Sequence, residues 1–182
     1  MNTISKCWNW TCFSALTLAL CVTLAASRPA RAEDLTAKAL LDRAQIQDLI
    51  THYYYNFGKD SPENFTDFYA DDAELILGDT HFKGRDGIAK AYSRAANPAQ
   101  KTPTQKAYAF NVTISNPLIV VHGTSATSQL IFTEFLMQKQ GDTPTIRTQG
   151  REYATFVKVN GKWRYKTRQI KGGTEPPADW KE

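Results

Sequence analysis

The stretch that decides the fold is ALLDRAQIQDLITHYYYNF, residues 39–57. Its apolar positions are Leu41, Ile46, Leu49, Ile50, Tyr53 and Phe57. They recur at intervals mostly of three and four, as in an amphipathic helix with one face towards a core. Three consecutive tyrosines on a helix point about 100° apart, so at most two of them face the same cavity. We therefore predict a helix whose aromatic end either packs in the core and its rim or lines a binding pocket.

The N-terminus predicts export. Lys6 precedes an uncharged apolar run at residues 12–26, and Ala-Arg-Ala at residues 30–32 precedes the first acidic residues. This order is the three-region pattern of a secretory signal peptide. The apolar run is shorter than the roughly 20 residues that a membrane span requires. We predict cleavage after Ala32, a secreted or periplasmic protein, and no membrane association after cleavage.

The sequence predicts three parts of the chain. Residues 1–32 are the predicted signal peptide, residues 33–171 the predicted folded domain, and residues 172–182, which contain two prolines, an extended C-terminal tail. All three cysteines of the chain lie in the leader. The mature protein is therefore expected to form no disulfide and to bind no metal through sulfur.

The charge of the mature chain is close to neutral. The whole chain has 22 basic and 18 acidic residues, and three of the basic residues fall in the predicted leader, leaving a net charge of about +1. A chain with so little excess charge offers no electrostatic argument for binding nucleic acid or an anionic membrane surface. We expect neither partner.

The order of elements predicts an α+β fold. A second short helix is expected from Ser61 and a third from Arg85, ending near Asn97. Runs rich in β-branched and aromatic residues then predict strands, which turn signals separate. The predicted strands are residues 71–78, 81–84, 108–114, 118–121, 127–137, 146–159 and 163–170, with turns at 116–117, 122–123, 141–142 and 160–161. We expect three N-terminal helices packed in the concave face of a curved, mostly antiparallel sheet.

Several of these stretches resemble a known family. Residues 42–50, 65–73 and 82–88 resemble the opening of SnoaL-like proteins, and Asn160-Gly161-Lys162-Trp163 with Arg168 resembles their closing hairpin. These proteins belong to the nuclear transport factor 2-like superfamily, whose fold is a cone formed by a curved sheet wrapped round helices. The resemblance covers residues 40–170. It implies an apolar pocket inside the cone that takes a hydrophobic, ring-containing small molecule without a cofactor.

The resemblance also implies a reaction class. Enzymes of this superfamily carry out lyase, dehydratase or isomerase steps by proton transfer, which needs one group to move the proton and a donor to hold the developing oxyanion. The tyrosine–aspartate pair of scytalone dehydratase would fall on Phe57 and Gly58, and its two histidines on Asn111 and near Leu136. Its histidine mechanism is therefore not carried over. The alternative is a non-catalytic ligand-binding or dimeric interaction module, since the fold alone does not determine the function.

The catalytic candidates come from strand alternation. Glu152 shares a strand face with Ala154 and Phe156, and Arg168 on the last strand is the cation expected beside it. This pair is either an ion pair that joins two strands or a base, with Arg168 or Asn111 holding an oxygen. Glu134 is a second carboxylate candidate, provided that no bulge turns it outward.

The remaining candidates line the expected pocket. Their residue types supply aromatic stacking, hydroxyl groups and one imidazole. They are Tyr53 and His81 as further catalytic candidates, and Tyr54, Phe57, Phe132 and Leu136, with Glu134, as substrate-binding residues.

No cofactor is expected from the motifs. The sequence has no phosphate-binding loop, dinucleotide fingerprint or serine-triad signature. Asp71 and Asp72 have no histidine at metal-ligand spacing, so we expect no metal. A homodimer is expected through the outer face of the sheet, where Ile131, Thr133, Phe135 and Met137 would lie.

Overall fold

The computed structural model describes residues 36–57, 65–96, 108–173 and 175–180. All of them belong to the unit that spans residues 34–182. The signal peptide, the second helix expected from Ser61 and the helix end expected near Asn97 lie outside the described residues, so these remain predictions. None of the described helices is both long enough and apolar enough to cross a membrane.

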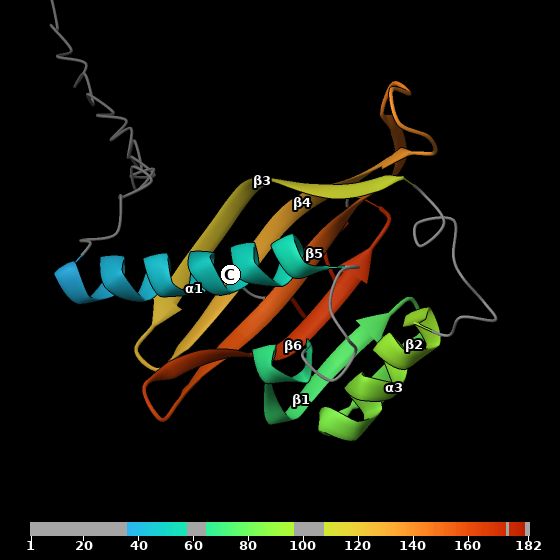
Figure 1. Ribbon diagram of the computed structural model, residues 1–182. Coiled ribbons are helices and arrows are strands. Elements are labelled where there is room, and N and C mark those ends of the chain that lie inside the picture. The colour runs from blue at the N-terminus through green and yellow to red at the C-terminus, as the bar shows by residue number, and fades with distance from the viewer. Residues whose placement is uncertain (1–35, 58–64, 97–107, 174, 181–182) are drawn as a thin grey trace, which may run out of the picture. The chain divides into compact units, whose positions relative to one another are not determined.

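The described residues form one six-stranded sheet in the order β2-β1-β6-β5-β4-β3. Neighbouring strands are antiparallel except β1 and β6, which pair in parallel. The strands are β1 (Tyr69–Leu77), β2 (Thr80–Lys83), β3 (Ala109–His122), β4 (Ser125–Met137), β5 (Thr145–Val159) and β6 (Lys162–Lys171). The predicted α+β class with a curved, mostly antiparallel sheet is confirmed (Figure 1).

The described helices pack on this sheet from two places. Helix α1 (Ala37–Asn56) crosses the sheet over β3 to β6, and α3 (Gly84–Ala96) lies beside β1 and β2 (Figure 1). A short 3-10 helix, η1 (Thr66–Phe68), leads into β1. Helix α3 begins one residue before the predicted Arg85. The two α-helices and the sheet therefore enclose the space where a pocket was expected.

Of two turns predicted from asparagine-containing dipeptides, one is present and one is not. Asn160 and Gly161 both have positive φ, 49° and 78°, and join β5 directly to β6, which confirms the predicted two-residue turn. Asn116 also has a positive φ of 50°, yet β3 continues through it. The predicted turn at residues 116–117 is wrong because the backbone forms a bulge there, with a register shift between Ser115 and Leu118.

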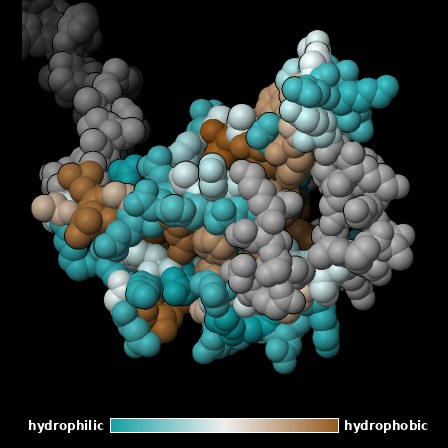
Figure 2. Space-filling model, in the orientation of Figure 1, coloured by the Kyte–Doolittle hydropathy of each residue, from teal (hydrophilic) through white to brown (hydrophobic). Residues whose placement is uncertain are grey.

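The buried face of α1 differs from the predicted stripe at its start. Ile46, Ile50, Tyr53 and Tyr54 are buried, whereas Tyr55 is 69% exposed, as three successive tyrosines on a helix require. Leu41 is 59% exposed, so its predicted burial is wrong. With Leu40 it contributes to the apolar patch over the beginning of α1 in Figure 2.

Asp42 takes the buried place at the start of α1. Its carboxylate accepts hydrogen bonds from the Lys158 ammonium (2.5 Å), the Lys38 ammonium (2.7 Å) and the Trp163 indole N–H (3.1 Å). The hydrogen bond from Lys158, followed by that from Lys38, holds the pKa of the Asp42 carboxyl well below its ordinary value. These contacts fix the first half of α1 to the β5–β6 hairpin.

We expect Asp42→Asn to lower the free energy of unfolding by about 2 kcal/mol at neutral pH, because the Lys158 and Lys38 ammonium groups and the buried Trp163 indole lose a charged acceptor. The lowered pKa means that Asp42 stabilises the fold above its ordinary pKa of 3.8 and loses this contribution as the pH falls further. The difference in the free energy of unfolding between Asp42→Asn and the unaltered protein, measured by urea unfolding, should therefore become smaller below about pH 4. Asp48→Asn, at an exposed position of the same helix, is the control. An equal effect of both substitutions would contradict the prediction.

The C-terminal tail is folded back rather than extended. The Trp180 backbone N–H donates to the Pro177 carbonyl (3.0 Å), Pro177 is buried, and the Trp180 ring lies edge-on against Tyr153 with centroids 5.2 Å apart. The predicted extended tail is therefore corrected, because its apolar residues cover an aromatic ring on the sheet.

The outer face of β4 carries the residues expected at a dimer interface. Ile131, Phe135 and Met137 are half-buried, and Thr133 is buried and accepts a hydrogen bond from the Gln149 amide (2.9 Å). They alternate with the inward Phe132 and Leu136, as strand geometry requires. The homodimer itself remains a prediction.

Candidate functional site

A cavity of about 210 Å³ lies between the end of α1, α3 and the sheet. Its wall is mostly apolar and aromatic, with one carboxylate, one guanidinium and three tyrosine side chains. The lining residues are Tyr53, Tyr54, Phe57, Leu75, Leu77, Ala91, Tyr92, Phe132, Glu134, Arg168 and Ile170. The structure therefore brings together six of the predicted site residues, namely Tyr53, Tyr54, Phe57, Phe132, Glu134 and Arg168.

The Phe132 ring packs on the cavity wall over Gly150 of the neighbouring strand, which has no side chain to displace it. Phe132 pairs with Gly150 across β4 and β5, and its ring stacks on Tyr54 with centroids 6.4 Å apart. A Cβ on Gly150 would lie 2.7 Å from the Phe132 ring and 2.8 Å from the Lys171 carbonyl oxygen. Only glycine fits this position without a shift of the backbone.

Glu152 and Arg168 form the predicted ion pair directly behind the cavity wall. Glu152 is 0% exposed, and its Oε2 accepts hydrogen bonds from Arg168 Nε (2.7 Å) and the Tyr54 hydroxyl (2.6 Å), while Oε1 accepts from the Tyr165 hydroxyl (3.2 Å). Glu152 is not among the residues that line the cavity. Its predicted position inside the pocket is therefore corrected, because Tyr54 and Arg168 lie between its carboxylate and the open space.

Arg168 is held in place by two tyrosines as well as by Glu152. Its Nη1 donates to the Tyr53 hydroxyl (2.9 Å) and its Nη2 to the Tyr54 hydroxyl (3.0 Å). The guanidinium carbon also lies 4.2 Å from the centroid of the Tyr53 ring. Burial alone would lower the pKa of Arg168, but the Glu152 carboxylate raises it well above its ordinary value. The side chain is therefore a fixed cation whose charge Glu152 balances.

Three tyrosine hydroxyls continue this network. The Tyr53 and Tyr92 hydroxyl oxygens are 2.8 Å apart, as are those of Tyr69 and Tyr92. Because Tyr53 accepts from Arg168, its own proton goes to Tyr92, its one other hydrogen-bond partner among the described residues. Three hydroxyl protons share two hydroxyl–hydroxyl hydrogen bonds, so one proton is left over between Tyr92 and Tyr69. Of these two residues, Tyr92 lines the cavity.

Burial keeps these hydroxyls protonated. Desolvation raises the pKa of Tyr53, Tyr54 and Tyr92 above the ordinary value, and the nearby Arg168 charge only partly opposes this shift. Desolvation raises the pKa of Tyr69 and Tyr165 in the same way. All five side chains therefore act as hydrogen-bond donors and acceptors, not as anions, at neutral pH.

Glu134 is the carboxylate on the cavity wall. It lies on β4 between the inward residues Phe132 and Leu136, and it forms an ion pair with Arg147. The register between β4 and β5 shifts after Glu134, but the extra residue, Arg147, is on β5, so the alternation of β4 leaves the Glu134 side chain inward. Leu136 is buried nearby but is not among the lining residues.

Two catalytic candidates lie away from the cavity. Asn111 is exposed, because β3 turns its neighbours Val112 and Ile114 towards the core. His81 is exposed on β2, and its Nδ1 lies 2.8 Å from a carboxylate oxygen of Glu74 on β1. The expectation that these two side chains reach the pocket is wrong.

Sequence reasoning missed Tyr92. It falls on the helix expected from Arg85, but nothing in the sequence singled it out as a site residue. No sequence signal links it to Tyr53 and Tyr69, which contact it from other elements. Within the described residues, no three His, Cys, Asp or Glu side chains form a group that could hold a metal ion.

The comparisons with known proteins agree with this architecture. Residues 38–169 match the family model of the SnoaL-like domain. A search of curated proteins finds no match. Among solved structures, a nuclear transport factor 2-like protein with a cystatin-like fold from Novosphingobium aromaticivorans is similar, with 22% identity, 73% of this chain and 82% of that chain covered, and a TM-score of 0.59.

Two further structures show the same fold. A protein from the same organism, provisionally named a scytalone dehydratase, has 20% identity, covers 81% of this chain and 100% of its own, and gives a TM-score of 0.60. A protein of unknown function with a cystatin-like fold from Nostoc punctiforme has 21% identity, coverage of 79% and 97%, and a TM-score of 0.61. At these identities the likeness establishes the fold and leaves the reaction open.

Proposed function

The chain belongs to the SnoaL-like domain family, and from the site above we propose that it is an exported protein that binds a compact, ring-containing molecule and moves a proton on it without a cofactor. The observation that carries this proposal is the surplus hydroxyl proton shared by Tyr92 and Tyr69, because Tyr92 lines an otherwise apolar cavity together with Arg168. A buried donor without an acceptor is costly, so a ligand oxygen placed there gains a hydrogen bond.

The charges around the cavity favour a neutral ligand. Arg168 is balanced by Glu152, and Glu134 by Arg147. A ligand carboxylate would therefore add an uncompensated charge to a buried site. A carbonyl oxygen suits the site better, since it accepts hydrogen bonds while neutral and more strongly as it becomes an oxyanion.

The proton-moving group that we assign is Glu134. It lines the same cavity as the hydroxyl donors, whereas Glu152 lies outside the cavity and holds Arg168 and Tyr54 in position. Glu134 would take a proton from the carbon next to the carbonyl, and Tyr92 and Arg168 would hold the resulting oxyanion. Returning the proton to another carbon completes an isomerisation, and loss of a neighbouring hydroxyl as water completes a dehydration.

The cavity volume limits the substrate. About 210 Å³ is below the roughly 300 Å³ at which pockets for drug-sized ligands begin. A single ring carrying one carbonyl therefore fits better than a fused polycyclic molecule. The aromatic wall formed by Tyr54, Phe57 and Phe132 would stack on such a ring.

A thermal-shift screen tests the proposal. Cyclic ketones would be compared with the matching hydrocarbons on the full chain and on Tyr92→Phe. A ligand at about 100 times its dissociation constant should stabilise the fold by roughly 2.7 kcal/mol. We expect the ketones to stabilise the unaltered protein and to lose most of that effect on Tyr92→Phe. Equal stabilisation by ketone and hydrocarbon would overturn the assigned donor.

We expect Glu134→Gln to reduce turnover of any bound substrate about 10²- to 10⁴-fold, because the amide cannot accept the proton, while ligand affinity stays nearly unchanged. The measurement is product formation under saturating substrate, beside the dissociation constant. Glu74→Gln, a surface carboxylate that contacts His81, is the control. Turnover that survives in Glu134→Gln would contradict the assignment.

A ligand-binding module without turnover is the second candidate function. The observation that favours it is the ion pair between Glu134 and Arg147, which occupies the one carboxylate on the cavity wall. Under this candidate, the thermal-shift screen finds ligands, but the unaltered protein and Glu134→Gln both form no product from them.

A further inference from the structure

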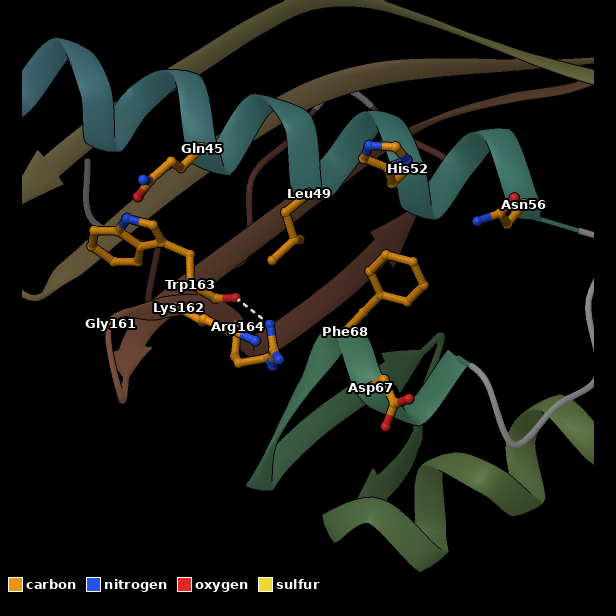
Figure 3. Close-up of a pocket in the computed structure, with 10 residues that line it drawn as sticks. All are labelled: Gln45, Leu49, His52, Asn56, Asp67, Phe68, Gly161, Lys162, Trp163 and Arg164. Carbon is orange, nitrogen blue, oxygen red and sulfur yellow. Dashed lines mark hydrogen bonds between the residues drawn. The ribbon is translucent and has the colours of Figure 1, made fainter.

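A second hollow lies against α1 and shares no lining residue with the cavity. It is a groove with a volume of about 630 Å³, and its lining residues come from α1, η1 and the β5–β6 hairpin (Figure 3). The α1 side chains Gln45, Leu49, His52 and Asn56 line it. They span twelve residues of helix, or about 16 Å at the helical rise.

The floor of the groove is apolar and fixed. Leu49, Phe68 and Trp163 line it (Figure 3). Trp163 is buried and its indole N–H donates to Asp42, so the hairpin cannot move away from α1 without breaking that hydrogen bond. A preformed apolar floor of this kind binds ligands without a cost for ordering it.

The rim of the groove carries uncompensated positive charge. Lys162 and Arg164 line it, and neither forms an ion pair with any of the described residues, although the Arg164 Nη1 donates to the Trp163 carbonyl (3.0 Å). Asp67, the one acidic side chain among the groove residues, is paired with Arg85 at 2.6 Å. Gln45, His52 and Asn56 have no hydrogen bond to the described residues through their side chains. The groove therefore offers two cations and several free polar groups to a ligand.

We propose that this groove is a second binding site, for an elongated organic anion whose apolar body lies on Trp163 and Phe68 and whose acidic group contacts Lys162 and Arg164. Charge complementarity distinguishes it from the interior cavity, where the cations are already balanced. The inference does not depend on the proposed reaction, because the two sites share no residue. The site selects for a carboxylate or sulfonate on an apolar ring or chain.

The test compares 2-naphthoate with its neutral counterpart 2-naphthamide on the ¹⁵N-labelled full chain by NMR titration. We expect naphthoate to give saturable shifts at the Gly161 amide and the Trp163 indole, and naphthamide to give little or none. Replacing both cations, in Lys162→Ala with Arg164→Ala, should weaken naphthoate binding about fivefold to tenfold, since exposed charge pairs are individually weak. Added salt should weaken it as well.

The matched control replaces two cations outside the groove, in Lys139→Ala with Arg151→Ala, which removes the same net charge. Tyr92→Phe is a second control that alters only the interior cavity. Both should leave naphthoate binding unchanged. Four outcomes would each overturn the proposal. The first two are equal binding of naphthoate and naphthamide, and an equal loss of naphthoate affinity in Lys139→Ala with Arg151→Ala. The others are chemical-shift changes at cavity residues instead of the hairpin, and changes that do not saturate.

Discussion

Replacing Arg168 by methionine is expected to lower the free energy of unfolding by about 3–5 kcal/mol, because Glu152 would then be a buried carboxylate without a cation. Glu152 is fully buried and its Oε2 loses the Arg168 Nε donor, retaining only the hydroxyls of Tyr54 and Tyr165 for the carboxylate. Hydroxyl hydrogen bonds do not replace a counter-charge at such a depth. Urea unfolding followed by circular dichroism measures the loss.

Two further variants test the physical reason. Arg164→Met, at a half-exposed position of the same strand, should change stability by no more than about 0.5 kcal/mol. Adding Glu152→Gln to Arg168→Met should recover part of the lost stability, because the buried charge is removed. If the double variant is less stable than Arg168→Met alone, the buried charge is not the cause.

Raising the pH above about 10 is expected to unfold the protein cooperatively. Burial raises the pKa of five tyrosines, Tyr53, Tyr54, Tyr69, Tyr92 and Tyr165. Their unfolded-state pKa is about 10, so the stability that they provide is complete below that pH and is lost as the pH rises above it. Each contributes a slope of about 1.4 kcal/mol per pH unit, or about 7 for all five. That slope exhausts an ordinary domain stability within about two pH units.

Tyrosinate absorbance and far-UV circular dichroism should therefore change together across this transition. Tyr92→Phe removes one of the five protons and should make the stability curve less steep by about 1.4 kcal/mol per pH unit. Complete ionisation of the tyrosines while the circular dichroism stays native would show that water reaches the hydroxyl network, which contradicts their burial.

Patterns along the chain were enough to predict most of the architecture. The periodicity of residues 39–57 and the Asn160-Gly161 turn both depend on local backbone geometry, and both appear in the structure. The pairing of Glu152 with Arg168 also followed from strand alternation, which depends only on which strands are neighbours. These features are predictable because each has one dominant local cause.

The parts that failed depend on contacts between distant elements. Leu41 is exposed because Lys158 and Trp163, more than a hundred residues away, offer Asp42 the hydrogen bonds that make its burial favourable. The surplus hydroxyl proton between Tyr92 and Tyr69 could be predicted only by knowing that α1 and β1 each place a hydroxyl against Tyr92. Asn111 was predicted to face inward from its alignment with a catalytic histidine of scytalone dehydratase. On β3, however, Val112 faces the core, so its neighbour Asn111 faces outward.

The parallel pairing of β1 with β6 has a consequence for how the chain folds. Leu75 on β1 pairs with Arg168 on the last strand, so the two ends of the domain must meet before the sheet is complete. Contacts between residues so far apart in the chain make folding slow relative to helical proteins, since a long loop must close first. A chain still emerging from the ribosome lacks β6. It therefore lacks Arg168, and the ion pair of Arg168 with Glu152 cannot yet form. The site is therefore incomplete until the final strand of the sheet has been made, and until then the exposed apolar surface of the chain is open to chaperones.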